Sequence, residues 1–307
     1  MLRFYPAALS AFLFFSLLFI PGCNRSQLKV VGVIPKGNAD LFWQSVHAGA
    51  IKSAQENKLN LIWNGPPNET DFSTQLKIVE TMIDRHVDAI ALAPSDKEAM
   101  VNVVERAESQ GIPVVIYDSA INTDKYASFI ATDNYAAGEM AGERIGQILK
   151  GKGKIVMLKT SPGGASTTAR EDGCRHVLQT KYPGVQILDE RFGMATVSQA
   201  LDVAENMLTA HPDLDAMFAS SESSSNGALQ ALRHRGKNVK LVAFDWSPVL
   251  LDALKNHEVD SLVIQDPFKM GEEAVKVCAQ ILNHQPITKQ LALLPRLVTA
   301  ENINDPE

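Results

Sequence analysis

Several features that mark other classes of protein are missing from this sequence. Its net charge is −6 and no basic run follows the first few residues, which argues against a nucleic-acid partner. No GxSxG motif and no Ser–His–Asp or Cys–His set is apparent, so an enzyme such as a hydrolase is disfavoured. The seven histidines form no i, i+4 pair and no HxH cluster, so neither a metal site nor a cofactor is predicted.

The composition is that of a soluble globular protein. Hydrophobic residues make up 45% of the chain and charged residues 21%, and the 307 residues are enough for two α/β lobes. There is no low-complexity tract and no short repeat. Two of the three cysteines, Cys174 and Cys278, lie far apart in helix-like stretches, and we expect both to be buried free thiols.

The third cysteine follows an apolar N-terminal run. Ala7 to Ile20 is almost wholly apolar, and Pro21-Gly22-Cys23 comes next. A run of this length is typical of a secretory signal and not of a membrane span. Ile20 to Cys23 resembles a bacterial lipobox, which predicts a signal peptide over residues 1–22 and a lipid on the sulfur of Cys23. An ordinary signal peptide with a chance cysteine is the alternative.

Apolar, β-branched runs alternate with helical patterns along the rest of the chain. The first hundred or so residues after the signal show four such alternations, which is typical of a doubly wound parallel sheet. The alternation begins again after a helix that starts near Tyr135. The sequence therefore predicts two Rossmann-like lobes of one architecture, one before and one after about residue 133.

Acidic residues stand directly after two neighbouring predicted strands. Ile112 to Tyr117 ends on Asp118, and Ala127 to Ala131 is soon followed by Asp133. In an open α/β sheet, ligands bind at the carboxyl ends of the strands. Asp118 precedes no obvious helix, so we favour a ligand role for it. Asp133 is either a site residue or the N-cap of the next helix.

Other strand ends carry hydroxyl, amide, acidic and aromatic side chains. Two facing sheets with such ends would enclose a polar cleft with aromatic walls. Acids and amides exchange hydrogen bonds with hydroxyls, and aromatic rings cover the C–H faces of a sugar, so the cleft predicts a small polyhydroxylated ligand. These residues are Asn38, Phe42 and Trp43 after the first strand, and Ser220, Ser221, Glu222, Asp245 and Gln265 later.

Six blocks, in their order and spacing, resemble the type I periplasmic substrate-binding proteins of ABC importers, of the ribose- and galactose-binding kind. The resemblance implies two lobes, joined by a three-crossover hinge, that close on one ligand. The implied lobes are 27–132 with 266–290, and 133–265 with 291–307. The blocks are GVIPKGNADLFWQSVHAGA, GIPVVIYDS, ATDNYAAGEMAGE, FASSESSSNGALQAL, LVAFDWSP and VIQDPFKMGEEAV.

The resemblance also implies roles for single residues. First-loop aromatics sandwich the sugar in this family, which is the role implied for Phe42 and Trp43. Asp118 matches an acid that binds adjacent hydroxyls, and Arg170 matches the arginine of the second lobe. Judged from the residues alone, Phe42 and Trp43 have an alternative role in the helix core, and Asp245 has one as a helix cap. Arg170 and Gln265 have an alternative role as surface side chains. The implied ligand-binding set is Asn38, Phe42, Trp43, Asp118, Ser119, Asp133, Arg170, Ser221, Phe244, Asp245 and Gln265.

The chain departs from the ribose-type pattern in its polar and aromatic positions. Ser119 stands where the pattern has an arginine, and Ala93 and Ser221 stand where it has asparagines. Met194 and Ala195 stand near a position that is aromatic in the pattern. The resemblance therefore points to a ligand other than ribose, such as a larger sugar, a pentitol or another polyol.

Together these features predict a monomeric, non-enzymatic binding lipoprotein outside the cytoplasm. It would hold a sugar or sugar alcohol, deliver it to an ABC permease, and stay at the membrane of the periplasm or cell surface through its lipid. A receptor of the same fold that presents its ligand to a membrane sensor or chemoreceptor is the alternative. A transcription repressor is disfavoured by the export signal and the missing helix-turn-helix.

Overall fold

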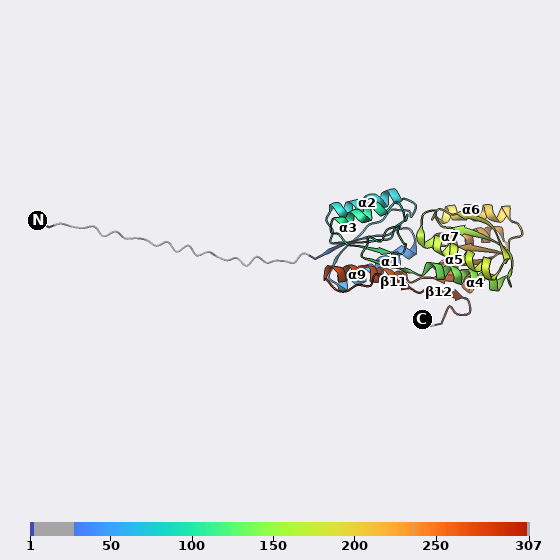
Figure 1. The fold of residues 1–307 in the computed structure, drawn as a ribbon. Helices are drawn as coiled ribbons and strands as arrows, with labels where there is room; N and C mark the ends of the chain where they lie inside the picture. The colour runs from blue at the N-terminus through green and yellow to red at the C-terminus, as the bar shows by residue number, and fades with distance from the viewer. Residues whose placement is uncertain (3–27, 237, 306–307) are drawn as a thin grey trace.

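The computed structural model describes residues 1–2, 28–236 and 238–305 and contains two lobes side by side (Figure 1). Each lobe has a six-stranded sheet with helices on both faces, so the predicted pair of doubly wound lobes is confirmed. Cys23 and nearly all of the predicted signal peptide lie outside the described residues. Within the described part of the chain, no helix combines the length and the apolar character needed to cross a membrane.

The first lobe is built on an all-parallel sheet of order β11-β5-β4-β3-β1-β2. Its central strands are apolar along their whole length, because helices cover both faces of the sheet. Its strands are β1 (Val30–Ile34), β2 (Asn60–Trp63), β3 (Ala89–Leu92), β4 (Val114–Tyr117), β5 (Ser128–Thr132) and β11 (Gln290–Leu293). Its helices are α1 (Leu41–Glu56), α2 (Phe72–Asp84), α3 (Val101–Ser109) and α9 (Pro267–Leu282).

The second lobe repeats this plan with the order β12-β10-β9-β8-β6-β7, in which only β12 is antiparallel to its neighbour. Its strands are β6 (Lys152–Lys159), β7 (Gly184–Phe192), β8 (Ala216–Ala219), β9 (Lys240–Phe244), β10 (Ser261–Ile264) and β12 (Arg296–Thr299). Its helices are α4 (Asn134–Ile148), α5 (Ala165–Lys181), α6 (Val197–Ala210), α7 (Glu222–Arg235) and α8 (Pro248–Lys255).

Each sheet has a buried apolar layer on both of its faces. In the first lobe, α1 and α9 pack on one face and α2 and α3 on the other. In the second lobe, α4 and α5 cover one face and α6, α7 and α8 the other. Cys174 and Cys278 lie in these layers as buried free thiols, which confirms that prediction.

The chain passes between the lobes three times. The passages follow β5, β10 and β11, and all three connections are short. The resemblance assigned residues 291–307 to the second lobe, but β11 extends to Leu293 because Gln290–Leu293 pairs in parallel with Phe129–Thr132 of the first sheet. The third passage therefore lies after Leu293.

Glycines let one helix pair in each lobe cross at close range. Gly49 and Gly271 lie where α1 meets α9, and Gly138 and Gly173 lie where α4 meets α5. A Cβ atom at any of the four would lie 1.9–2.2 Å from a backbone oxygen of the partner helix. The oxygen facing Gly138 belongs to Arg170, so this crossing also fixes the backbone from which that arginine extends.

We expect Gly271→Ala to destabilise the first lobe. Its added Cβ would lie 2.0 Å from the carbonyl oxygen of Val46, and moving two packed helices apart costs about 1–3 kcal/mol. Alanine favours the helix over glycine by about 1 kcal/mol, which offsets part of this cost. Urea denaturation measures the change, with Gln55→Ala on the exposed face of α1 as the control. Equal stability of both variants would contradict the close crossing.

Candidate functional site

A small polar cavity lies between the two lobes. The volume within it that is open to a water-sized molecule is about 20 Å³, so the lobes are nearly closed on one another. Side chains of both lobes form its wall, which makes it the counterpart of the cleft that the sequence predicts. The first lobe contributes Lys36, Asp40, Phe42, Trp43, Glu69 and Asp118, and the second contributes Ser166, Thr167, Arg170, Ser221, Glu222, Asp245 and Gln265.

Asp118 and Asp245 occupy equivalent places in the two lobes. Asp118 follows β4 and Asp245 follows β9, both have φ near 63°, and both are less than a tenth exposed. Their backbone N–H groups donate to Ile130 and Val263, at 2.9 Å in each case. The left-handed conformation is uncommon for residues other than glycine and is concentrated at functional sites. Each lobe thus presents one strand-end carboxylate to the cavity.

A buried lysine accompanies the first of these acids. Lys36 Nζ lies 2.5 Å from Asp118 Oδ2, and both side chains are about 95% buried. The lysine is therefore the ion-pair partner of this carboxylate. Lys36 Nζ also donates to Ser166 Oγ across the cleft, at 3.0 Å. The Oγ of Ser119 donates a hydrogen bond to the same Ser166 Oγ at 2.8 Å. Ser119 itself is not part of the cavity wall and lies behind Ser166.

A buried arginine accompanies the second acid. The Arg170 guanidinium lies 3.7 Å from Asp245 Oδ2. Its Nε donates to Asn134 Oδ1 at 2.8 Å, and its Nη1 donates to the Ser220 carbonyl at 2.9 Å. The guanidinium carbon lies 4.7 Å from the ring centre of Phe244. These contacts fix the arginine's planar group against the cavity.

Phe244, which the implied ligand-binding set includes, does not line the cavity. Its side chain is fully buried and packs edge-on against Phe218, beneath Arg170. The aromatic part of the wall comes from Phe42 and Trp43, whose rings meet edge-to-face at 5.0 Å. Trp43 Nε1 donates to Glu69 Oε1 at 2.7 Å. Both predicted first-loop aromatics therefore line the cavity.

Glu222 ties the second lobe to the first. Its carboxylate accepts the backbone N–H groups of Leu41 and Phe42, at 3.2 and 2.9 Å, at the start of α1. An anion is stabilised at a helix N-terminus because the unpaired N–H groups and the helix dipole both attract it. Gln265 makes a second link, since its Nε2 donates to Asp245 and its Oε1 accepts from Thr132 of β5. Both residues therefore join one lobe to the other.

Of the eleven predicted binding residues, seven line the cavity and four do not. Asn38 lies on the other side of Trp43, where its amide donates to the Gly65 carbonyl at 2.7 Å. Asp133 is exposed and caps α4 by accepting from Ala136 N, which is the alternative left open for it. The other two are Ser119 and Phe244. The seven are Phe42, Trp43, Asp118, Arg170, Ser221, Asp245 and Gln265.

Six wall residues were absent from the predicted set. Lys36 and Asp40 belong to the same loop as Asn38, and sequence alone does not say which of the three faces inward. Glu69 is in a loop with no recognisable signal. Ser166 and Thr167 lie in the first turn of α5 and were not singled out, and Glu222 was noted at a strand end but was not part of the implied ligand-binding set. The missed residues are Lys36, Asp40, Glu69, Ser166, Thr167 and Glu222.

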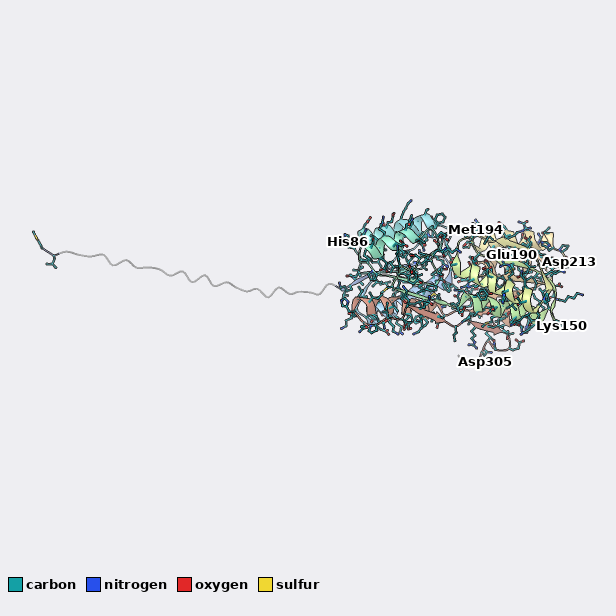
Figure 2. The ribbon with its side chains drawn as sticks, viewed as in Figure 1. His86, Lys150, Glu190, Met194, Asp213 and Asp305 are labelled. Atoms are coloured by element: carbon teal, nitrogen blue, oxygen red, sulfur yellow. The ribbon has the colours of Figure 1, made fainter. Side chains whose placement is uncertain are left out.

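Met194 marks a further departure from the family pattern. It lies on the side of the second lobe toward the first, whereas Lys150 and Asp213 lie at that lobe's opposite end (Figure 2). Its side chain is 38% exposed and is not part of the cavity wall. No aromatic ring from this loop covers the cavity.

Burial raises the pKa values of four of the acids in the cavity wall. Burial raises the pKa of Asp40 to about 8, and the neighbouring charges of Glu69, Glu222 and Asp245 add to the shift. Burial also raises the pKa of Glu222 to about 7, and raises the pKa values of Glu69 and Asp245. Within the described ranges, no three His, Cys, Asp or Glu side chains are grouped so that they could hold a metal ion.

Glu171, beside Arg170, makes the stability of the second lobe depend on pH. Burial raises the pKa of Glu171 to about 7, although Ser220 Oγ donates to its carboxylate at 2.9 Å. The folded protein therefore holds a proton that the unfolded chain releases near pH 4.5, and the free energy of unfolding should fall as pH rises from 4.5 to 7. The contribution is up to about 3 kcal/mol.

Glu171→Gln tests this assignment, because glutamine keeps the shape and removes the titration. Urea denaturation at several pH values between 4.5 and 7.5 should give a shallower decline for the variant than for the native protein. An equally steep decline would show that other groups cause it.

The comparisons with known proteins agree on one family. The profile of the family described as "Periplasmic binding protein domain" matches residues 31–286. The chain is 30% identical to the ribose import binding protein RbsB of Bacillus subtilis, over 84% of this chain and 83% of that protein. It is 27% identical to a xylitol-binding protein of Mycolicibacterium smegmatis, over 91% of this chain and 80% of that protein.

Solved structures give the same result. An ABC transporter solute-binding protein from Agrobacterium vitis with bound D-fucose is similar with a TM-score of 0.87 and 31% identity, over 90% of this chain and 97% of that one. A carbohydrate transporter solute-binding protein from Agrobacterium radiobacter in complex with D-arabinose is similar with a TM-score of 0.88 and 26% identity, over 91% and 97%.

Proposed function

Because this chain belongs to the periplasmic binding protein family, whose members are binding proteins of transporters and not enzymes, we propose that it binds a sugar or sugar alcohol and delivers it to an ABC permease. The predicted family and the predicted non-enzymatic class are both confirmed. The proposal draws on the sugars and the polyol named for its relatives, which include ribose, xylitol, D-arabinose and D-fucose.

The observation that carries the proposal is the cavity shared by the two lobes. Strand-end carboxylates accept hydrogen bonds from hydroxyls, Arg170 donates to them, and the ring of Phe42 offers an apolar surface to C–H groups. The cavity is too small for a sugar as it stands, so the lobes must part to admit one. The short connections after β5, β10 and β11 are the natural hinge.

A panel of pentoses, hexoses and their alditols tests the proposal. A ligand that contacts both lobes favours the closed state, so a binder should raise the melting temperature and reduce the radius of gyration measured by X-ray scattering. Calorimetry should give a micromolar or lower Kd. No thermal shift with any member, together with stabilisation by a peptide or a nucleobase, would overturn the proposal.

The proposal also places the protein outside the cytoplasm, as a monomer held at a membrane by a lipid on Cys23. The IPGC stretch after an apolar run supports this placement. Labelled palmitate should enter the native protein and not Cys23→Ser, because stable anchoring needs acyl chains on that residue. Label that persists in Cys23→Ser would refute the anchor.

A further inference from the structure

Most helices of this protein supply their own N-terminal cap. Of the nine helices in the described part of the chain, six begin at a residue whose side-chain oxygen accepts a backbone N–H of the first turn. Such a cap stabilises a helix because its first N–H groups have no partner within the helix. Among the described helices, α1, α3 and α5 have no side-chain cap of this kind. Two of these, α1 and α5, begin at the cavity between the lobes.

A residue of the second lobe caps α1. Asp40 stands at the N-cap position, but its side chain makes no cap bond in the described structure. The carboxylate of Glu222 accepts the backbone N–H groups of Leu41 and Phe42 instead, at 3.2 and 2.9 Å. These are the first two residues of the helix. The turn that is capped in this way carries Phe42 and Trp43, the aromatic part of the cavity wall.

A residue of the first lobe caps α5 in return. The N-cap position of α5 is Gly164, which has no side chain that could accept a hydrogen bond. The Oγ of Ser119 accepts the backbone N–H of Ser166 at 3.1 Å and donates to Ser166 Oγ at 2.8 Å. Ser166 is the second residue of the helix, a position whose N–H an N-cap side chain normally accepts. The next turn of α5 carries Arg170, which lines the cavity.

We infer that Ser119 and Glu222 are positioning residues, each of which caps a helix of the opposite lobe only when the lobes close. Each cap joins residues of different lobes, so parting the lobes breaks both. The freed N–H groups then bond to water, and the first turns of α1 and α5 fray more readily. Closure therefore orders the aromatic pair and Arg170 as it brings them together.

The two caps are coupled because one movement of the lobes forms both. Removing either cap makes closure less favourable, so the other cap also forms less often. A cap that served only its own helix would have no effect on the opposite lobe. An effect of each cap on both helices therefore distinguishes this arrangement from ordinary helix capping.

Hydrogen exchange, followed by mass spectrometry of peptides and measured without added sugar, tests this coupling. Ser119→Ala should speed exchange at Ser166 and, in the other lobe, at the start of α1. Glu222→Gln replaces one of two acceptor oxygens by an amide nitrogen that cannot accept, and should speed exchange at the same places. Each increase should be about two- to thirtyfold, which is the effect of losing one N-cap. At pH 8, above the pKa of about 7 of Glu222, this carboxylate is charged in the native protein.

Two control variants make the same changes within a single lobe. Ser247→Ala removes a buried serine that caps α8 by accepting the N–H of Leu250 at 3.1 Å. Glu108→Gln alters a glutamate that accepts the backbone N–H of Val114 at 2.7 Å. Each control should speed exchange near its own contact and leave the starts of α1 and α5 as in the native protein.

Three results of the exchange measurement would overturn the inference. One is that Ser119→Ala or Glu222→Gln changes exchange only at the helix that it caps. Another is that the controls act on both lobes as strongly as these two variants do. The third is that both helix starts of the native protein exchange as fast as an unstructured peptide, since the caps would then not form.

A second measurement rests on the proposed function. Ser119 is not part of the cavity wall, so a loss of affinity in Ser119→Ala reports on closure. Each pentose, hexose or alditol that binds should show a Kd raised by a similar factor, about two- to thirtyfold, and Ser247→Ala should leave it unchanged. Unchanged Kd values in Ser119→Ala would overturn the positioning role and leave the sugar-binding function standing. If no member of the panel binds, the proposed function fails and the exchange results decide the inference.

Discussion

Replacing Arg170 by lysine is expected to weaken ligand binding about ten- to a hundredfold or more, without unfolding the protein. Lysine keeps the positive charge but lacks the planar guanidinium group of arginine. In Arg170 this group already donates one hydrogen bond to Asn134 and one to the Ser220 carbonyl. Lysine also loses the guanidinium's position over Phe244. A hydrogen bond to a charged group contributes about 1.5–3 kcal/mol, and about 1.4 kcal/mol corresponds to a tenfold change in Kd.

Calorimetry with the ligand that the panel identifies measures this loss, and circular dichroism checks the fold. Arg175→Lys is the matched control, because Arg175 lies on the same helix but pairs with Glu190 and Asp172 outside the cavity. It should bind the ligand as the native protein does. Near-native affinity of Arg170→Lys would show that the ligand binds elsewhere.

Asp118→Asn is expected to weaken binding by a similar factor, for a different reason. Asparagine tolerates the left-handed backbone that Asp118 adopts at φ 63°, so the substitution isolates the charge from the conformation. The substitution replaces a carboxylate acceptor in the cavity wall by a weaker amide acceptor. It also leaves the buried Lys36 without the partner of its ion pair. Removing one partner of a buried pair is costly because the remaining charge is uncompensated.

The comparison of Asp118→Asn with Asp133→Asn separates the site from a general charge effect. Asp133 is exposed at the start of α4, and asparagine is as good an N-cap as aspartate. Only Asp118→Asn should raise the Kd. If both variants bind alike, Asp118 is not a ligand contact.

The double variant of Asp118 and Arg170 tests whether the lobes act together. The two residues lie in different lobes, so each single variant weakens the ligand contacts of one lobe only. If either substitution prevents closure, the two effects on the free energy of binding should be less than additive. Fully additive effects would indicate that the two residues contact the ligand independently of closure.

The architecture followed from local patterns. The β4 run Val114–Tyr117 is apolar and β-branched, so it reads as a strand buried on both faces, and the acid that ends it falls at the sheet edge where ligands bind. Asp118 and Asp245 were found in this way. The repeat of the same alternation after residue 133 indicated the second lobe.

The cap at Asp133 shows where local pattern becomes ambiguous. An acid between a strand and a helix fits both a ligand contact and an N-cap, since both roles need an exposed oxygen near the strand end. The structure shows that its oxygen accepts from Ala136 N. The path of the backbone from β5 into α4 decides that Asp133 caps the helix. No single residue in the sequence records that path.

The sequence by itself determined most of the helices and strands, the two lobes and the strand-end acids, because each depends on periodicity within a few residues. Only the tertiary structure decided which side of the first loop faces the cavity, so that Lys36 and Asp40 line it and Asn38 does not. It also decided that Glu222 caps a helix about 180 positions away in the sequence. Such contacts depend on how segments far apart in the chain meet in the folded protein, and no spacing along the chain records that.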